Sequence, residues 1–222
     1  MRKSTVLGIL FLGSVWGVSE VFLGEPLYAA HVRYASAPLN VIALVILAVA
    51  AASFQQTGSA IAMGCCAALY KLAAMSFGLA GTPVYACHLL GIFCLGLSFE
   101  VFFSLRRAKS PAGFQSAGAI GPAARAVAAA YVSYALFAFS ITYLFRYQPW
   151  VDGGFAKVGR HVAVEGTLAA LGGAILVPFS MYVVSRAKAA RLRLLPFGSK
   201  LGAAAASAAT AALWVVGIVV GV

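Results

Sequence analysis

Long apolar runs constrain this chain more than any other feature of its sequence. An α-helix needs about 20 mostly apolar residues to cross a bilayer, and the chain offers seven such stretches: 5–24, 37–54, 59–80, 84–105, 124–145, 165–185 and 201–222. These runs lack the alternation of apolar and polar residues that is typical of a membrane β-barrel strand. The sequence therefore predicts an all-α, polytopic transmembrane bundle of about seven spans, forming one domain over residues 1–222.

The amino-acid composition supports this prediction. Hydrophobic residues make up 63% of the chain and charged residues only 9%, whereas soluble domains carry about a quarter charged residues. The connections between the apolar runs are mostly short, so they leave no room for a soluble catalytic domain. The first run also begins like a signal peptide, but the late position of Glu20 and the length of the run favour a retained span.

Basic residues are distributed unevenly between the two sides of such a bundle. With the N-terminus inside, the cytoplasmic side holds Arg2, Lys3, Arg106, Arg107, Lys109, Arg125, Arg186, Lys188, Arg191, Arg193 and Lys200. The outer side holds Arg33, Arg146, Lys157 and Arg160. Because Lys and Arg collect in cytoplasmic loops, we expect a multi-pass protein of the inner (plasma) membrane with Val222 outside. Topology and contact with lipid then explain the net charge of +11 without a nucleic-acid partner.

Small residues mark two of the predicted spans. Gly13 and Gly17 form a GxxxG pattern in the first, and residues 203–212 of the last are rich in alanine. Such spacing lets helices approach closely. The two interpretations are packing inside the bundle and a face for a helix of a partner subunit.

Apart from Arg125 and Glu165 at the ends of spans, three charged residues fall inside the predicted spans. At about 1.5 Å of rise per residue, Glu20 lies about 22 Å and Lys71 about 18 Å from the inner ends of their helices. We therefore predict a Glu20–Lys71 ion pair in the outer half of the bundle, with either a functional or a structural role. Glu100 lies near the inner end of its span, where it would reach the inner interface or meet a cytoplasmic partner.

The three histidines all fall on the predicted outer side. His31 is in the first outer loop, and His88 is one turn into the fourth span. His161 precedes Glu165 by four residues, which places both on one face of a helix. Imidazole and carboxylate ligands suit transition-metal ions, so His31, His88, His161 and Glu165 form a candidate metal site. The alternative is that each histidine simply donates or accepts a hydrogen bond.

Sequence motifs of enzymes are missing from this chain. It has no nucleophile elbow, P-loop, HEXXH or zinc-deaminase pattern, and its four cysteines include no CxxC. We predict that the protein is not an enzyme and has no cofactor, although a transition-metal ion is one candidate substrate. The loop at 146–164 is the largest outer connection, with Tyr147 and Trp150 as an interfacial anchor.

Several segments of the first half of the chain resemble a known group of proteins. They are the stretch from Gly13 to Gly24 with His31, the segment 67–72 around Lys71, and the run that ends at Glu100. They are similar to bacterial membrane proteins related to the substrate-binding S components of energy-coupling factor (ECF) transporters. This resemblance implies a helical bundle that captures a vitamin or a metal ion from the outer side. It also implies a transmembrane coupling subunit and cytoplasmic ATPases as partners. The nickel and cobalt versions begin Met-His, and this chain begins Met1-Arg2-Lys3 instead.

Three functions follow as hypotheses. A substrate-capture subunit predicts an outward-opening cavity lined by Glu20, Tyr70, Lys71 and His88. A membrane anchor or assembly subunit predicts tightly packed polar pairs and no cavity. A membrane enzyme acting on a lipid or cofactor predicts a side opening toward lipid, with Glu20 and His88 as acid and base.

Overall fold

The computed structural model describes residues 3–54, 56–74, 76, 84–109, 120–189 and 200–219, and within these ranges the chain is helical with no strand. The long helices are α1 (Lys3–Phe22), α3 (Ser36–Phe54), α4 (Ser59–Ala74), α5 (Val84–Lys109), α6 (Ile120–Phe139), α9 (Gly166–Ala189) and α10 (Lys200–Val219). The short ones are α2 (Gly24–Ala29), α7 (Gln148–Val151), α8 (Gly154–Arg160) and the π-helical segments η2 (Ser140–Leu144) and η3 (His161–Glu165).

Five helical stretches of the described chain are long and apolar enough to cross a membrane: Lys3–Ala29, Ser36–Phe54, Cys87–Ser104, Ile120–Leu144 and Gly154–Ala189. The other two predicted spans correspond to shorter apolar helices, Ser59–Ala74 and Gly202–Val216. Residues 75 and 77–80 of one predicted span, and 220–222 of the other, lie outside the described residues. The all-helical prediction is confirmed, and five of its spans have the length and composition that it requires.

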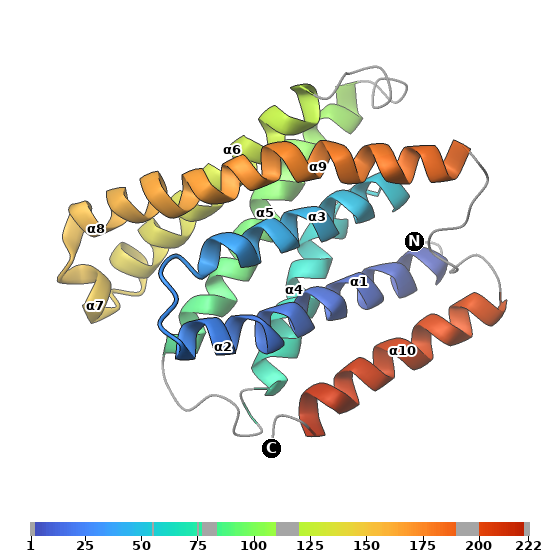
Figure 1. Ribbon diagram of the computed structural model, residues 1–222, viewed down its shortest axis with the longest axis horizontal. Coiled ribbons are helices and arrows are strands. Elements are labelled where there is room, and N and C mark those ends of the chain that lie inside the picture. Colours follow the sequence, from blue (N-terminus) through green and yellow to red (C-terminus); the bar gives the residue numbers. More distant parts are fainter. Residues whose placement is uncertain are drawn as a thin grey trace.

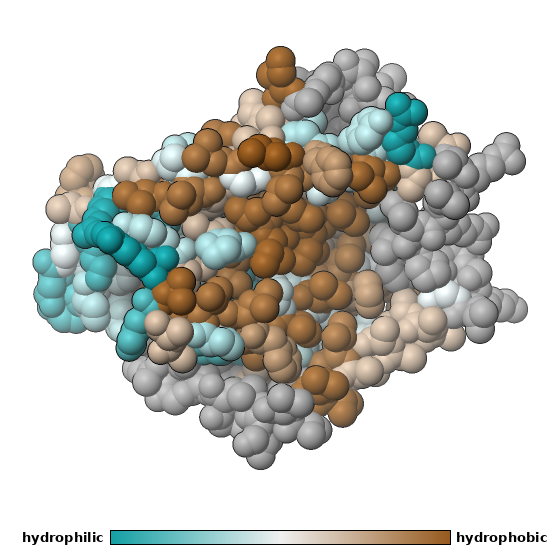
Figure 2. Space-filling model, in the orientation of Figure 1, coloured by the Kyte–Doolittle hydropathy of each residue, from teal (hydrophilic) through white to brown (hydrophobic). Residues whose placement is uncertain are grey.

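Six of the long helices form a closed ring in which each packs on the next, in the order α1, α4, α5, α6, α9, α3 and back to α1. Successive long helices alternate in direction, and α10 lies outside the ring against α1 (Figure 1). Hydrophobic residues spread over the middle of α3 and α9, whereas polar residues gather at the end that carries α7 and α8 (Figure 2). This surface pattern suits a bundle with an apolar belt in the middle and a polar surface at the α7–α8 end.

The GxxxG glycines pack inside the bundle. A Cβ atom on Gly13 would lie 2.7 Å from the Cβ atom of Cys66, and one on Gly17 would lie 2.6 Å from that of Tyr70. Both neighbours belong to α4, so the two glycines allow α1 and α4 to approach closely. The glycine face of α1 therefore packs against α4 of the same chain. This is packing inside the bundle, the first of the two interpretations of the pattern.

Helix α10 is attached to the ring by polar as well as apolar contacts. The Tyr70 hydroxyl donates to the Leu213 carbonyl oxygen over 2.8 Å, and the Trp214 Nε1–H donates to the Ser14 hydroxyl over 2.9 Å. The rings of Tyr70 and Trp214 meet edge to face, with centroids 5.1 Å apart. These contacts use the side of α1 and α4 that faces away from the centre of the ring.

The end of the bundle that carries the chain's N-terminus holds a buried, fully satisfied carboxylate. Glu100 of α5 accepts the backbone N–H of Gly58 over 2.8 Å and that of Ala60 over 2.9 Å. Its two oxygens thereby cap the first turn of α4, where free N–H groups and the helix dipole favour negative charge. Glu100 therefore caps the N-terminus of α4. This role differs from both interpretations of the sequence, contact with the inner interface and contact with a cytoplasmic partner.

The opposite end is more structured than the sequence suggests. Residues 146–164, expected to be a loop, contain α7, α8 and most of η3, and Glu25 lies in the short helix α2. The segment is rich in Gly and charged residues, so it lacks the apolar run by which a spanning helix is recognised. Its helices matter because they close one side of the cavity described next.

Candidate functional site

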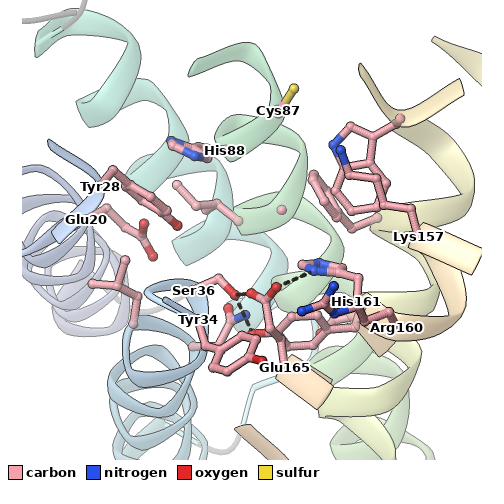
Figure 3. A pocket seen from close by; sticks show the side chains of 18 of the residues that line it. Glu20, Tyr28, Tyr34, Ser36, Cys87, His88, Lys157, Arg160, His161 and Glu165 are labelled. Atoms are coloured by element: carbon pink, nitrogen blue, oxygen red, sulfur yellow. Dashed lines mark hydrogen bonds and ion pairs between the residues drawn. The ribbon is translucent and has the colours of Figure 1, made fainter. Parts of the chain in front are cut away.

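A cavity of about 490 Å³ lies at the polar end of the ring. The side chains that line it come from α1, α2, α3, α5, α6, α7, α8 and η3, and from the α2–α3 and η2–α7 connections. Aromatic rings make up much of its wall: Tyr28, Tyr34, Tyr134, Phe137, Tyr147 and Trp150. Its charged and imidazole groups are Glu20, Arg33, His88, Lys157, Arg160, His161 and Glu165. Figure 3 shows Glu20, His88, Lys157, Arg160, His161 and Glu165 around the cavity.

One wall of the cavity is a hydrogen-bonded network that joins three helices. Glu165 of η3 accepts a hydrogen bond from the Ser36 hydroxyl with one oxygen, and its other oxygen lies 2.8 Å from Nδ1 of His161. The Ser36 hydroxyl also lies 3.0 Å from that of Tyr134 on α6. The carboxylate of Glu165 is therefore held from two sides and faces the cavity in a defined orientation (Figure 3).

His161 lies inside an aromatic box. Its ring centroid is 4.9 Å from that of Tyr134, 5.6 Å from that of Phe137 and 5.0 Å from that of Trp150. The Lys157 ammonium lies 5.1 Å from the centroid of the Trp150 ring, within the range of a cation–π interaction. Tyr147 and Trp150 thus line the cavity, and Trp150 holds α7 against α6 and η3.

The wall opposite this network is built by α1, α2 and α5. Glu20 and Tyr28 point into the cavity from α1 and α2 (Figure 3). The Tyr28 ring stacks on His88 of α5, with centroids 4.4 Å apart. The Trp16 Nε1–H donates to Glu20 over 3.3 Å. Glu20 is only 6% exposed, so it lies at the deep end of the cavity.

Lys71 lies behind Glu20 rather than in the cavity. Its ammonium is 4.0 Å from the Glu20 carboxylate and 3.2 Å from that of Glu25, and its side chain is 1% exposed. The predicted Glu20–Lys71 pair is therefore present, but Glu25 is the nearer partner. One ammonium between two carboxylates offsets part of the cost of burying these charges.

The structure brings together some of the predicted binding residues and separates others. Glu20 and His88 line the cavity, whereas Tyr70 and Lys71 do not. Tyr70 faces α10, where its hydroxyl bonds to Leu213. The sequence places Tyr70 and Lys71 at the right depth, but their direction around α4 depends on which helices pack against it.

The candidate metal ligands do not converge. His161 and Glu165 share one face as predicted, and their side chains are in contact. His88 lies on the opposite wall, stacked on Tyr28, and His31 is not among the lining residues. In the described part of the chain, no three His, Cys, Asp or Glu side chains come close enough to hold a metal ion.

Several important residues of the cavity escape sequence reasoning. Ser36, Tyr134 and Tyr34 belong to no motif, and the sequence identifies Arg33 only as an outer basic residue. Tyr34 has a φ of 63°, which is unusual for a bulky residue and occurs mainly where the surrounding structure imposes it. The π-helical segment η3, which contributes His161 and Glu165 to the cavity, also lacks a recognisable sequence pattern, although such segments often lie at functional sites.

No family model, no curated protein and no solved structure matches the chain. Aromatic walls, carboxylates with fixed partners and exposed cations at the mouth are groups that hold and orient a small molecule.

Proposed function

We propose that this protein is the membrane-embedded, substrate-binding subunit of a transporter, similar in role to the S component of an ECF system. It captures a small, vitamin-like micronutrient from the outer side of the inner membrane. The observation that carries the proposal is the cavity of about 490 Å³ with its aromatic wall. That volume lies in the range of small-molecule sites, about 300–1,000 Å³.

The proposed topology has seven membrane helices with the N-terminus inside and the C-terminus outside. The ends of α3 and α9 support a common inner face, because the Lys188 ammonium donates to the carbonyl oxygens of Ala52 and Ser53 over 2.6 and 3.0 Å. A cation at the C-terminal end of a helix is favourable. With the N-terminus inside, the cavity lies at the outer end, where a substrate arrives.

The aromatic lining favours an organic molecule over a bare metal ion as the substrate. Rings such as Tyr28, Tyr134 and Phe137 offer flat apolar surfaces, and offset stacking on such surfaces is specific for planar groups. Hydrogen-bond acceptors at Glu20 and Glu165 would then fix the orientation of that planar group.

The proposal includes partners that drive release. A transmembrane coupling subunit and cytoplasmic ATPases are the partners that the ECF resemblance implies. An anchor subunit is the alternative, but it predicts tight packing where the structure has a cavity. A membrane enzyme would use Glu20 and His88 as acid and base, and product formation in the binding assay below would reveal it.

The decisive experiment is to purify the protein in lipid nanodiscs and identify bound small molecules and metals by mass spectrometry. Gly91→Leu provides the test variant, because Gly91 lines the cavity and an added Cβ there would meet the Phe137 ring at an ordinary 3.8 Å. Gly159→Leu is the matched control, since no atom lies within 4 Å of its added Cβ and Gly159 does not line the cavity.

We expect an organic ligand in the native protein and in Gly159→Leu, and its loss from Gly91→Leu. Equal occupancy of the two variants would show that the ligand binds elsewhere. An empty native protein that takes up neither vitamins nor metals would count against substrate capture.

A further inference from the structure

The outer basic residues are exceptions to the charge distribution of the rest of the chain. Lys and Arg are depleted from the outer side of membrane proteins, and in the proposed topology only four lie there. Arg33, Lys157 and Arg160 line the cavity, and only Arg146 does not. They come from the α2–α3 connection and from α8, so tertiary structure gathers cations that are far apart in the sequence.

These three cations surround the mouth of the cavity. Arg33, Lys157 and Arg160 are all exposed, whereas Glu20 at the deep end is 6% exposed. The cavity therefore has a cationic mouth and a carboxylate at its base. Figure 3 shows Arg160 and Lys157 on the side of the cavity opposite Glu20 and Tyr28.

The protein itself supplies little negative charge to this mouth. Within the described ranges, the ion pairs involve Lys71 and His161 and none of the three mouth cations. Arg33 lies 4.9 Å from the centroid of the Tyr34 ring, and the Lys157 ammonium donates to the Pro149 carbonyl oxygen over 2.8 Å. Asp152 does not line the cavity, and its carboxylate accepts a hydrogen bond from Gln148.

The two carboxylates of the lining also have partners of their own. Glu165 is bonded to Ser36 and His161, and Glu20 to Trp16 with Lys71 behind it. These partners keep each carboxylate at its place in the wall. The positive charge of the mouth is therefore available to a bound molecule.

We propose that the ligand carries an anionic group, a carboxylate or a phosphate, which binds Arg33 and Arg160 at the cavity mouth while its planar body lies between the aromatic walls. The proposal rests on the proposed capture function and narrows its substrate to anionic aromatic molecules. Guanidinium groups match carboxylate and phosphate oxygens with two parallel hydrogen bonds. Lys157 adds a third positive charge at the same mouth.

The experiment measures binding by the full chain in phosphatidylcholine nanodiscs. Its probes are pairs that differ in one anionic group: pyridoxal 5′-phosphate with pyridoxal, flavin mononucleotide with riboflavin, and nicotinate with nicotinamide. We expect an anionic member to bind at least about tenfold more tightly than its neutral partner, since hydrogen bonds to charged groups are the strong ones.

Arg33→Gln and Arg160→Gln should each lower the affinity for that anionic probe by about tenfold or more. The affinity for its neutral partner should stay unchanged. Arg146→Gln is the matched control, because Arg146 is an exposed outer arginine that does not line the cavity. It should leave every affinity as in the native protein. An equal loss in all three variants would indicate general surface attraction and overturn the proposal.

Two further outcomes separate this inference from the proposed function. In the first, a neutral probe binds more tightly than its anionic partner, and Arg33→Gln and Arg160→Gln do not change its affinity. This result would overturn the proposal of an anionic ligand but would leave substrate capture in place. Binding of no probe at all would overturn the anionic aromatic class.

The anionic group could belong to a free molecule or to a lipid headgroup. Adding phosphatidylglycerol to the nanodiscs distinguishes these sources. Displacement of the probe by phosphatidylglycerol, dependent on Arg33 and Arg160, would support the anionic site and contradict uptake of a free micronutrient.

Discussion

The two ends of the bundle each bury a glutamate, and they treat it differently. Glu100 at one end is 7% exposed and has an N–H donor for each oxygen, 2.8 and 2.9 Å away. Glu20 at the other end has a longer hydrogen bond of 3.3 Å and an ammonium at 4.0 Å, and it borders a cavity. A carboxylate with short bonds to backbone donors serves the fold, whereas one with longer bonds beside open space is suited to a ligand.

The largest expected effect is the loss of the positive charge between Glu20 and Glu25. Lys71→Met leaves two carboxylates without their shared ammonium, and breaking a buried ion pair in this way costs about 3–5 kcal/mol. We expect a marked fall in Tm, measured by thermal unfolding in detergent. The triple change Lys71→Met, Glu20→Gln and Glu25→Gln should restore much of the stability, because it removes the stranded charges as well. An unchanged Tm in Lys71→Met would show that water already solvates these carboxylates.

The next effect concerns the cap of α4 at the other end. Glu100→Ala leaves the N–H groups of Gly58 and Ala60 without their acceptor, at a cost of about 1–3 kcal/mol for each one left unsatisfied. Tm should fall, while ligand affinity of the folded fraction stays constant. Glu100→Gln keeps one acceptor oxygen, so its Tm should fall by less than that of Glu100→Ala. Weaker ligand binding in Glu100→Ala would contradict the purely structural role of this end.

Glu20→Gln is expected to show the opposite pattern. Lys71 retains Glu25 at 3.2 Å, so the free energy of unfolding should change by less than about 1 kcal/mol, the scale of one neutral hydrogen bond. Ligand affinity, measured by isothermal titration calorimetry, should fall by about tenfold if Glu20 accepts a hydrogen bond from the ligand. Unaltered affinity with reduced Tm would make Glu20 a structural residue like Glu100.

The smallest effect should come from the network in the cavity wall. Ser36→Ala removes the hydroxyl between Glu165 and Tyr134, and one such hydrogen bond contributes about 1 kcal/mol. Ser133→Ala is the matched control, since its hydroxyl bonds to the Ala130 carbonyl of its own helix. Thermal unfolding should show a lower Tm for Ser36→Ala than for Ser133→Ala. Equal Tm values would mean that the network orients Glu165 without stabilising the fold.

Much of the architecture follows from the sequence alone. Apolar runs predict helices because hydrocarbon leaves each backbone N–H and C=O to be satisfied within its own helix. Depth along a helix is also computable from residue number, which is why the Glu20–Lys71 pair was predicted. The clustering of polar groups at one end follows from the same count, since Glu165 opens a predicted span and His161 precedes it by four residues.

Only the tertiary structure decides which side chains face one another. Ser36 and Glu165 are 129 residues apart and Glu100 and Gly58 are 42 apart, and no periodicity along the chain relates such positions. The same limit explains why the sequence predicts Tyr70 in the cavity although Tyr70 faces α10. It also explains why the sequence identifies Arg33 only as an outer basic residue, although Arg33 lines the cavity mouth. The sequence by itself determines which segments prefer hydrocarbon to water and how far along its helix each residue lies. The direction of a side chain around its helix axis is determined by the neighbouring helices that pack against it. The packing of these helices therefore decides which side chains line the cavity.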